Sequence, residues 1–282
     1  MKYMLIKTGA CVFGALGIID LSCMLAERCG VRICLSPSMW LWAVIVLSSL
    51  WYLIDGKFVS GFLVRRIEIN LPNFRTCINV FSGDLLAQSG CAIVPTNDFF
   101  DNVVNESIVA AKSVNGQMIK RFWPGNISEM DMAIKEELKN FPFKEEERTL
   151  PAKNRRYAIG TSIVLKAKEA FRIIWVALTH TDIITNKTHA GIEDLQLAIR
   201  SALVTARNKG NGDVLNIPLL GGGLSRTGLN SSFLLNLLIG MIVDESKKEN
   251  ITETINIVLT RKVIDELNLL EIKQSWEGKN GK

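Results

Sequence analysis

The sequence of 282 residues is long enough for one domain of ordinary to large size plus an appendage. Its formal net charge of +5 comes from basic and acidic residues that are well mixed, which argues against a nucleic-acid-binding protein. Two histidines and six cysteines without a CxxC pair disfavour a zinc site and a histidine-driven hydrolase. We therefore expect no metal and no cofactor, and the length excludes a small disulfide scaffold.

Two long apolar stretches lie within the first 60 residues. Residues 8–26, TGACVFGALGIIDLSCMLA, carry one charge, and residues 35–54, LSPSMWLWAVIVLSSLWYLI, carry none. Each stretch is long enough to cross about 30 Å of hydrocarbon as a helix. Aromatic residues typical of membrane interfaces lie near both ends of the second stretch: Trp40, Trp42, Trp51 and Tyr52. We predict a transmembrane hairpin in residues 1–60 and a second domain in residues 61–282.

A cleaved signal peptide is the alternative for the first stretch, because Lys2 and Lys7 precede it. Against it, no A-x-A cleavage site follows and a second apolar stretch comes at once. Basic residues are more numerous at the N-terminus and in residues 57–66 than in the connection, which predicts an inner or plasma membrane location with both termini in the cytoplasm. Cys29 and Cys34 would then face outward, where a disulfide is allowed but not required.

Asp20 is the charged residue within the first stretch. A carboxylate is costly in the middle of a membrane, so Asp20 either faces a partner helix or a pore, or reaches the interface. It is our candidate for a functional residue in the membrane.

Strand-like and helix-like patterns alternate after residue 61, which predicts an α/β fold with a mostly parallel sheet and helices on both faces. The stretch SSFLLNLLIGMIV at 231–243 is very apolar, but its 13 residues are short for a span and lie between strands, so we expect a core helix over 231–246. Ser128 with Asp131 resembles a capping box. The predicted strands are 64–71, 75–82, 90–95, 157–167, 171–180, 213–220 and 254–260. The predicted helices are 103–122, 126–141, 191–210, 231–246 and 261–274, with a charged loop at 142–156. The apolar face of helix 191–210 is predicted to contain Ile192, Leu195, Leu197, Ala198, Ala202 and Leu203.

The stretch NIPLLGGGLSRTGLN at 216–230 places three glycines between a strand and a helix. Glycines at such a junction let backbone N–H groups approach an anion, and the helix N-terminus adds a favourable dipole. A Walker A loop, a dinucleotide fingerprint and a nucleophile elbow are all excluded by spacing. A phosphate-binding loop is therefore our interpretation, and a glycine-rich turn without a ligand is the alternative.

Three segments in order resemble a macro domain, the ADP-ribose-binding fold: INVFSGDLL, CAIVPTND and LNIPLLGGGLSRTG. The resemblance covers roughly residues 66–272 and implies a macro-domain-like mixed sheet flanked by helices on both faces. It implies that Asp84 accepts a hydrogen bond from the adenine amino group, although a plain turn aspartate is the alternative. The implied ligand-binding residues are Asp84, Leu85, Pro95, Thr96, Asn97, Asp98, Gln117, Gly221, Gly222, Gly223, Leu224, Ser225, Arg226, Thr227 and Gly228.

The sequence departs from that family where hydrolytic macro domains have paired asparagines. An ungapped match gives Pro95 and Asp98, with Asn97 one position away, and Gln117 follows Gly116 in a segment that replaces the first phosphate loop. Asn97 and Gln117 either contact the ligand or are ordinary surface polar residues. The departure favours a sensor over an ADP-ribosyl hydrolase.

A two-helix anchor followed by a divergent macro domain is similar to the membrane effectors of bacterial Thoeris anti-phage systems, in which a TIR-domain enzyme makes an ADP-ribose-derived signal from NAD. This resemblance implies an antiviral membrane effector acting by abortive infection. Binding of the nucleotide signal, for example an amino-acid conjugate such as histidine-ADP-ribose, would trigger homo-oligomerisation and disruption of the lipid bilayer. The alternatives are a membrane-tethered ADP-ribosyl hydrolase and a receptor module that binds a protein.

Overall fold

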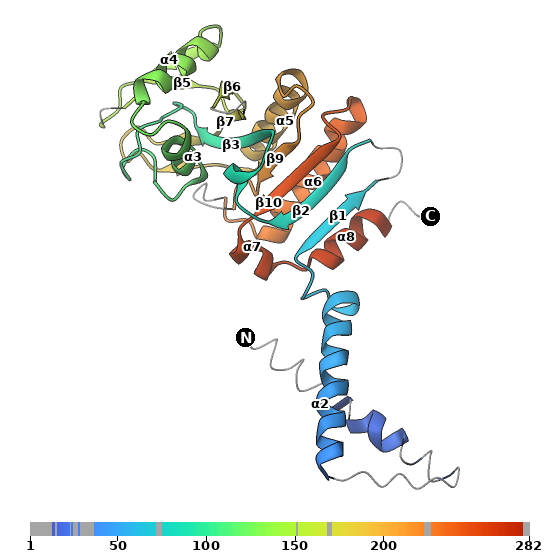
Figure 1. The fold of residues 1–282 in the computed structure, drawn as a ribbon. Helices are drawn as coiled ribbons and strands as arrows, with labels where there is room; N and C mark the ends of the chain where they lie inside the picture. Colours follow the sequence, from blue (N-terminus) through green and yellow to red (C-terminus); the bar gives the residue numbers. More distant parts are fainter. Residues whose placement is uncertain are drawn as a thin grey trace. The chain divides into compact units, whose positions relative to one another are not determined.

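The computed structural model describes residues 13, 14, 16–22, 24, 28, 37–71, 75–150, 152–167, 171–222 and 227–278. The chain divides into two compact units (Figure 1). The first comprises Met1–Val64 with Asn268–Glu271, and the second comprises Arg65–Leu267 with Ile272–Lys282. The division at residue 60 that the composition suggests stays a prediction.

The first unit contains helix α2 (Pro37–Ile54), which continues into a π-helical segment, η1 (Asp55–Val59). Among the described residues, one helical stretch, Leu41–Val59, is long and apolar enough to cross a membrane, and it is almost entirely exposed. It overlaps the second predicted span. The first predicted span lies largely outside the described residues; within it, residues 16–22 are helical and Asp20 is exposed. The transmembrane hairpin therefore stays a prediction.

The second unit is built on a mixed sheet with the order β1-β2-β10-β9-β3-β7-β6, and β8 pairs with β7. Strands β2, β10, β9, β3 and β7 are parallel neighbours, whereas β1 and β6 are antiparallel edge strands. The mixed α/β fold predicted from the sequence is confirmed. The strands are β1 (Arg66–Asn70), β2 (Cys77–Ser82), β3 (Cys91–Asn97), β6 (Ser162–Lys166), β7 (Arg172–Thr181), β8 (Thr188–His189), β9 (Leu215–Pro218) and β10 (Thr254–Leu259).

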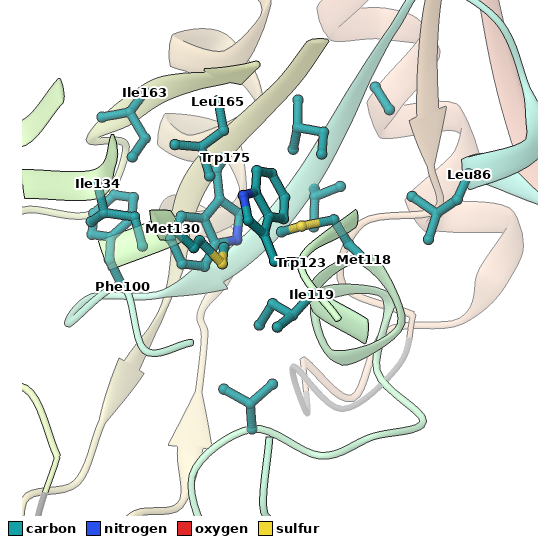
Figure 2. Packing of buried hydrophobic residues seen from close by; sticks show 14 of the residues in the cluster. Leu86, Phe100, Met118, Ile119, Trp123, Met130, Ile134, Ile163, Leu165 and Trp175 are labelled. Atoms are coloured by element: carbon teal, nitrogen blue, oxygen red, sulfur yellow. The ribbon is translucent and has the colours of Figure 1, made fainter. Parts of the chain in front are cut away.

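Helices cover both faces of this sheet because side chains alternate along its buried strands. On one face, Trp175 of β7 packs in a core cluster with Met118 and Trp123 from the α3 segment and Met130 of α4, as Figure 2 shows. Helix α5 packs on β7 and β6, and also contacts α6. The helices are η2 (Leu85–Ala87), α3 (Val114–Phe122), α4 (Ile127–Leu138), α5 (Ile192–Lys209), α6 (Ser231–Lys248), α7 (Arg261–Glu266) and α8 (Leu269–Glu277).

Several predicted helix boundaries are wrong. Only residues 114–122 of the predicted helix 103–122 are helical, because Ser113 caps α3 by accepting a hydrogen bond from the Gly116 N–H at 2.9 Å. The predicted helix 261–274 is interrupted between α7 and α8. The capping box at Ser128 is wrong, since α4 begins at Ile127 and Asn126 occupies the N-cap.

Two further predictions about faces and loops are wrong. The charged segment 142–156 is not simply a loop, because β4 (Phe143–Glu145) pairs antiparallel with β5 (Arg155–Tyr157). Ile192 and Leu197 of α5 are exposed rather than buried. Leu197 follows the buried Leu195 by two residues, which is about 200° around a helix, so the two side chains point in nearly opposite directions.

Candidate functional site

The predicted ligand-binding segments lie at one edge of the sheet, where the five parallel strands end. Asp84 follows β2, the Gly221 loop follows β9, and Asn97 ends β3. Strand β9 is the direct neighbour of β3, and β10 alone separates β9 from β2. Ligands of α/β sheets bind at this carboxyl edge. The fold therefore gathers at one edge three segments that are far apart in the sequence.

The Asp84 carboxylate is fixed in a turn and still reaches solvent. It caps η2 by accepting a hydrogen bond from the Leu86 N–H at 2.9 Å, and its other oxygen lies 3.1 Å from Arg121 Nη1. More than half of the side chain is exposed. Leu85, predicted to contact the ligand, is buried in the core cluster with Leu86 and anchors the turn. The carboxylate is thus positioned to accept a hydrogen bond from a ligand.

The end of β3 is irregular. Its pairing with β7 shifts register between Thr96 and Asn97. Pro95 is half-buried and Thr96 is buried, and the Thr96 hydroxyl lies 3.3 Å from the Asn115 amide nitrogen. This shift sets the direction in which Asn97 leaves the sheet.

Asn97 is held by a buried ionic network. Its amide nitrogen donates to the Asp101 carboxylate at 2.7 Å, and its amide oxygen accepts from the Asp101 N–H at 3.1 Å. Arg148 donates to both oxygens of Asp101 at 2.9 and 3.0 Å, and both side chains are about 2% exposed. The Arg148 guanidinium also lies 4.3 Å from the centre of the Phe99 ring. Both polar groups of the Asn97 side chain are therefore occupied.

Asp98 is fully buried and joins β3 to β7. One carboxylate oxygen accepts a hydrogen bond from the Thr181 N–H at 3.1 Å, and the other lies 3.1 Å from Arg156 Nε. Burial raises the pKa of the Asp98 carboxyl, and the neighbouring Arg156 opposes that rise. This predicted ligand residue serves as a link within the protein in the described arrangement.

The two histidines of the chain lie next to each other beside Asp98. His180 and His189 are paired across the β7–β8 hairpin, with ring centres 5.7 Å apart. His180 Nε2 is 3.1 Å from an Asp194 oxygen, and its Nδ1 is 3.6 Å from Asp98. Two histidines nine residues apart give no sequence signal for a pair, and the register of the β7–β8 hairpin is what brings them together.

Gln117 and the glycine loop complete the predicted set. Gln117 is exposed on α3, and its amide nitrogen donates to the Lys112 carbonyl at 2.9 Å. Gly221 has a positive φ of 83°, and its carbonyl accepts a hydrogen bond from the Thr227 hydroxyl at 2.8 Å. Gly222 is exposed and Gly228 has a φ of 70°. Residues Gly223, Leu224, Ser225 and Arg226 lie outside the described residues, so their part in the site stays a prediction.

The glycine loop lies against the first turns of two helices. A Cβ atom on Gly221 would lie 3.1–3.3 Å from side chains of Leu234, Thr227 and Leu195. Leu195 is in the first turn of α5 and Leu234 in the first turn of α6. Backbone N–H groups at helix N-termini suit an anionic ligand. Within the described parts of the chain, no group of three His, Cys, Asp or Glu residues could hold a metal ion.

Comparisons with known proteins agree with this fold. Residues 78–260 match the family described as Thoeris protein ThsA, Macro domain. The chain is 22% identical over 227 residues to Thoeris protein ThsA of Bacillus amyloliquefaciens (strain Y2), which covers 77% of this chain and 73% of that protein. The fold is similar to the Oceanobacillus iheyensis macrodomain with ADP (TM-score 0.50, 13% identity, 74% of this chain and 96% of that chain). A mutant of that macrodomain with ADPR gives a TM-score of 0.51 at 13% identity, over 74% of this chain and 98% of that chain. The chain belongs to the Thoeris protein ThsA macro domain family.

Proposed function

We propose that this protein is a membrane-anchored effector of anti-phage defence whose macro domain senses an ADP-ribose-derived nucleotide. The observation that carries the proposal is the family match, together with the Asp84 turn and the Gly221 loop at one sheet edge. Strands β2 and β9 are two positions apart, which separates their ends by about 10 Å. A nucleoside diphosphate can bridge that distance: its adenine amino group donates a hydrogen bond to Asp84, and one of its phosphates lies on the glycine loop. Macrodomains described with ADP and with ADPR support this ligand class.

The chain acts in this proposal as a sensor and not as an ADP-ribosyl hydrolase. Hydrolysis would need an amide or carboxylate free to contact the distal ribose. Both polar groups of Asn97 bond to Asp101, and Asp98 is buried against Arg156. A hydrolase is the alternative, and it requires that Asn97→Ala or Asp98→Ala abolish the release of ADP-ribose from esters or modified proteins.

The output of the sensor is damage to the membrane. The apolar helical stretch Leu41–Val59 supports an anchor in the bilayer. The ligand binds one arrangement of the macro domains more tightly and thereby favours assembly of several copies, because a ligand shifts a population only through its difference in affinity. Clustered anchors then open the bilayer, with Asp20 as the candidate lining residue. The receptor alternative, in which the sheet binds a protein, requires that Gly222→Val leave function intact.

Leakage from liposomes tests this proposal. We expect the full chain in phosphatidylethanolamine–phosphatidylglycerol liposomes to release a trapped dye when ADP-ribose or an amino-acid conjugate of ADP-ribose is added. Asp84→Ala should weaken the response to nucleotide about 10- to 100-fold, since a hydrogen bond to a charged group is worth about 1.5–3 kcal/mol. Glu136→Ala, which removes an exposed carboxylate from α4, is the matched control and should respond like the wild type. Leakage that does not depend on nucleotide would contradict the proposal.

A further inference from the structure

Residues Asn268–Glu271 belong to the first unit, although the chain before and after them belongs to the second. We call them the α7–α8 corner, because they follow α7 and include the start of α8. Within the first unit, Gly61 lies against this corner: a Cβ atom on Gly61 would lie 2.5 Å from Leu270 Cβ and 2.6 Å from Asn268 Oδ1. Gly61 also has a positive φ of 70°. Close approach and backbone conformation therefore both require glycine at this position.

The helix formed by α2 and η1, which we call the anchor helix, ends in a π turn that the following residues hold. The Ser60 N–H donates to the Asp55 carbonyl at 2.7 Å, and the Ser60 hydroxyl donates to the Asp55 carboxylate at 2.9 Å. The Leu63 N–H donates to the Gly56 carbonyl at 2.9 Å. Such turns are rare and occur frequently at functional sites. An α-helical form of the same turn would rotate the anchor helix by roughly 100°, the rotation of one helical residue.

In the second unit, α7 begins next to the turn that carries Asp84. Strand β10 runs parallel to β2, and the Gly83 N–H donates to the Leu259 carbonyl at the end of β10 at 3.1 Å. Thr260 follows as the N-cap of α7, and its hydroxyl accepts from the Val263 N–H at 3.4 Å. The Asp84 turn and the start of α7 are thus joined by a hydrogen bond between neighbouring strands.

The Gly221 loop is connected to the same helices through α6, which follows the loop. The hydroxyl of Ser231, the first residue of α6, donates to the Glu266 carboxylate at the end of α7 at 3.1 Å. The indole N–H of Trp276 in α8 donates to the Asn236 amide oxygen in α6 at 2.9 Å. Helix α6 therefore contacts α7 before the corner and α8 after it. Both predicted ligand-binding segments are connected to the chain that flanks the corner.

We propose that the α7–α8 corner couples the nucleotide site to the anchor helix. Through Gly61, the corner holds the chain after η1 in a position that depends on whether a ligand occupies the Asp84 turn and the Gly221 loop. The π turn is the element whose two forms this position selects, because coupling between sites requires an element with two arrangements. The inference rests on the proposed function and assigns the step between nucleotide binding and the event in the membrane.

Gly61→Ala in the full chain tests this coupling, since the added Cβ atom displaces the corner. We expect the dissociation constant of ADP-ribose, measured by calorimetry in detergent, to change by less than about fivefold, because no predicted nucleotide-binding residue is altered. The ADP-ribose concentration for half-maximal leakage from liposomes should rise at least about tenfold. Leu270→Ala, which shortens the side chain against Gly61 without straining the backbone, should shift leakage in the same direction.

The matched control is Gly125→Ala. Gly125 has a φ of 77°, and within the described part of the chain no atom lies within 4 Å of a Cβ atom at this position. The substitution therefore carries a similar backbone cost without displacing a neighbour. Nucleotide-dependent leakage of Gly125→Ala should equal that of the wild type.

Amide hydrogen exchange without nucleotide gives a second readout that does not depend on the sensor. The Leu267 N–H donates to the Ile264 carbonyl at the end of α7, and the Gly83 N–H reports on the Asp84 turn. Because coupling between sites is reciprocal, Gly61→Ala should speed exchange at both amides at least about fivefold relative to Gly125→Ala.

Three results would overturn the inference. They are leakage of Gly61→Ala at the same ADP-ribose concentration as the wild type, unchanged exchange at Gly83, and loss of ADP-ribose binding by Gly61→Ala but not by Gly125→Ala. The outcome also separates the two proposals. A wild type that binds no nucleotide, with exchange at Gly83 that responds to Gly61→Ala, contradicts only the sensor. Normal nucleotide binding with unchanged exchange at Gly83 contradicts only the coupling.

Discussion

Asn97 illustrates how single residues in this protein are positioned by side chains distant in the sequence. It is the residue nearest to the asparagine that hydrolytic macro domains use, yet Asp101 occupies its amide and Arg148 neutralises Asp101. Arg148 comes from the segment between β4 and β5, whose sequence predicts only a charged loop. The network holds the end of β3 against that segment and keeps Asn97 turned into the protein.

Removing Arg148 should be costly. We expect Arg148→Ala to lower the free energy of unfolding by about 3–5 kcal/mol, because it leaves the Asp101 carboxylate buried without its cationic partner. Lys144→Ala removes a mostly exposed cation from the neighbouring strand β4, and it should change the free energy of unfolding by less than about 1 kcal/mol. Urea unfolding of the full chain in detergent measures both variants. Equal effects of the two substitutions would show that the buried pair has no special role.

Titration of the Cys91 thiol contributes to the pH dependence of the free energy of unfolding. Burial raises the pKa of the Cys91 thiol from its ordinary value of 9.0 to about 12. Between these two values the native chain keeps a proton that the unfolded chain loses, so the free energy of unfolding falls as the pH rises. From pH 8 to pH 10 this loss is about 1.4 kcal/mol.

The matched variant for this prediction is Cys91→Ala, which lacks the thiol. Because every other titrating group is shared, the difference in unfolding free energy between the wild type and the variant should shrink by that amount from pH 8 to pH 10. A difference that is independent of pH would mean that the Cys91 thiol titrates alike in the native and unfolded chains.

At the scale of elements, the loop after β9 depends on one backbone conformation. Gly221 has a positive φ, and its carbonyl is held by the Thr227 hydroxyl. We expect Gly221→Ala to destabilise the protein by about 1–2 kcal/mol, the usual cost of a left-handed conformation for a residue with a Cβ atom. It should also weaken the binding of ADP-ribose, because the loop moves away from the phosphate.

The control is Gly212→Ala, at the other end of β9. Gly212 has a φ of 72° and no neighbouring atom within 4 Å of a Cβ atom, so it carries a similar backbone cost far from the proposed ligand. Gly212→Ala should therefore destabilise the protein without changing the dissociation constant of ADP-ribose. A Gly221→Ala variant that binds ADP-ribose like the wild type would remove the loop from the site.

The main strands and the long helices could be predicted from the sequence because their patterns are strong. Strand β7 is a long apolar run, and α5 has a clear periodicity of 3.6 residues. The three-residue strands β4 and β5 could not, since they are too short and too polar to show an alternation. Ser113 is a good N-cap inside a segment that otherwise resembles a helix, so the pattern predicts a start of α3 that is too early.

The candidate site was only partly predictable for a related reason. Asp84 and the glycine loop directly follow strands that the sequence predicts clearly. Because these strands are parallel members of one sheet, both segments are expected at the same sheet edge. The side chains that hold this region come from two distant segments: Arg148 pairs with Asp101, the partner of Asn97, and Arg156 and His180 lie beside Asp98. Contacts of this kind depend on how distant segments pack, and no local pattern records them.

At the scale of the whole molecule, a ThsA-type macro domain follows an apolar N-terminal segment in one chain. This combination connects a nucleotide in the cytoplasm to an event in the membrane in our proposal. The connection needs a ligand that changes the population of assembled copies. Every later step depends on recognition of the nucleotide.

Calorimetric titration of the full chain in detergent with ADP-ribose and with amino-acid conjugates of ADP-ribose tests this recognition most directly. We predict saturable binding with one nucleotide per chain for at least one of these compounds, and weaker binding by Asp84→Ala and Gly221→Ala than by Glu136→Ala. If the folded protein binds none of these compounds, our proposal of a nucleotide sensor is contradicted.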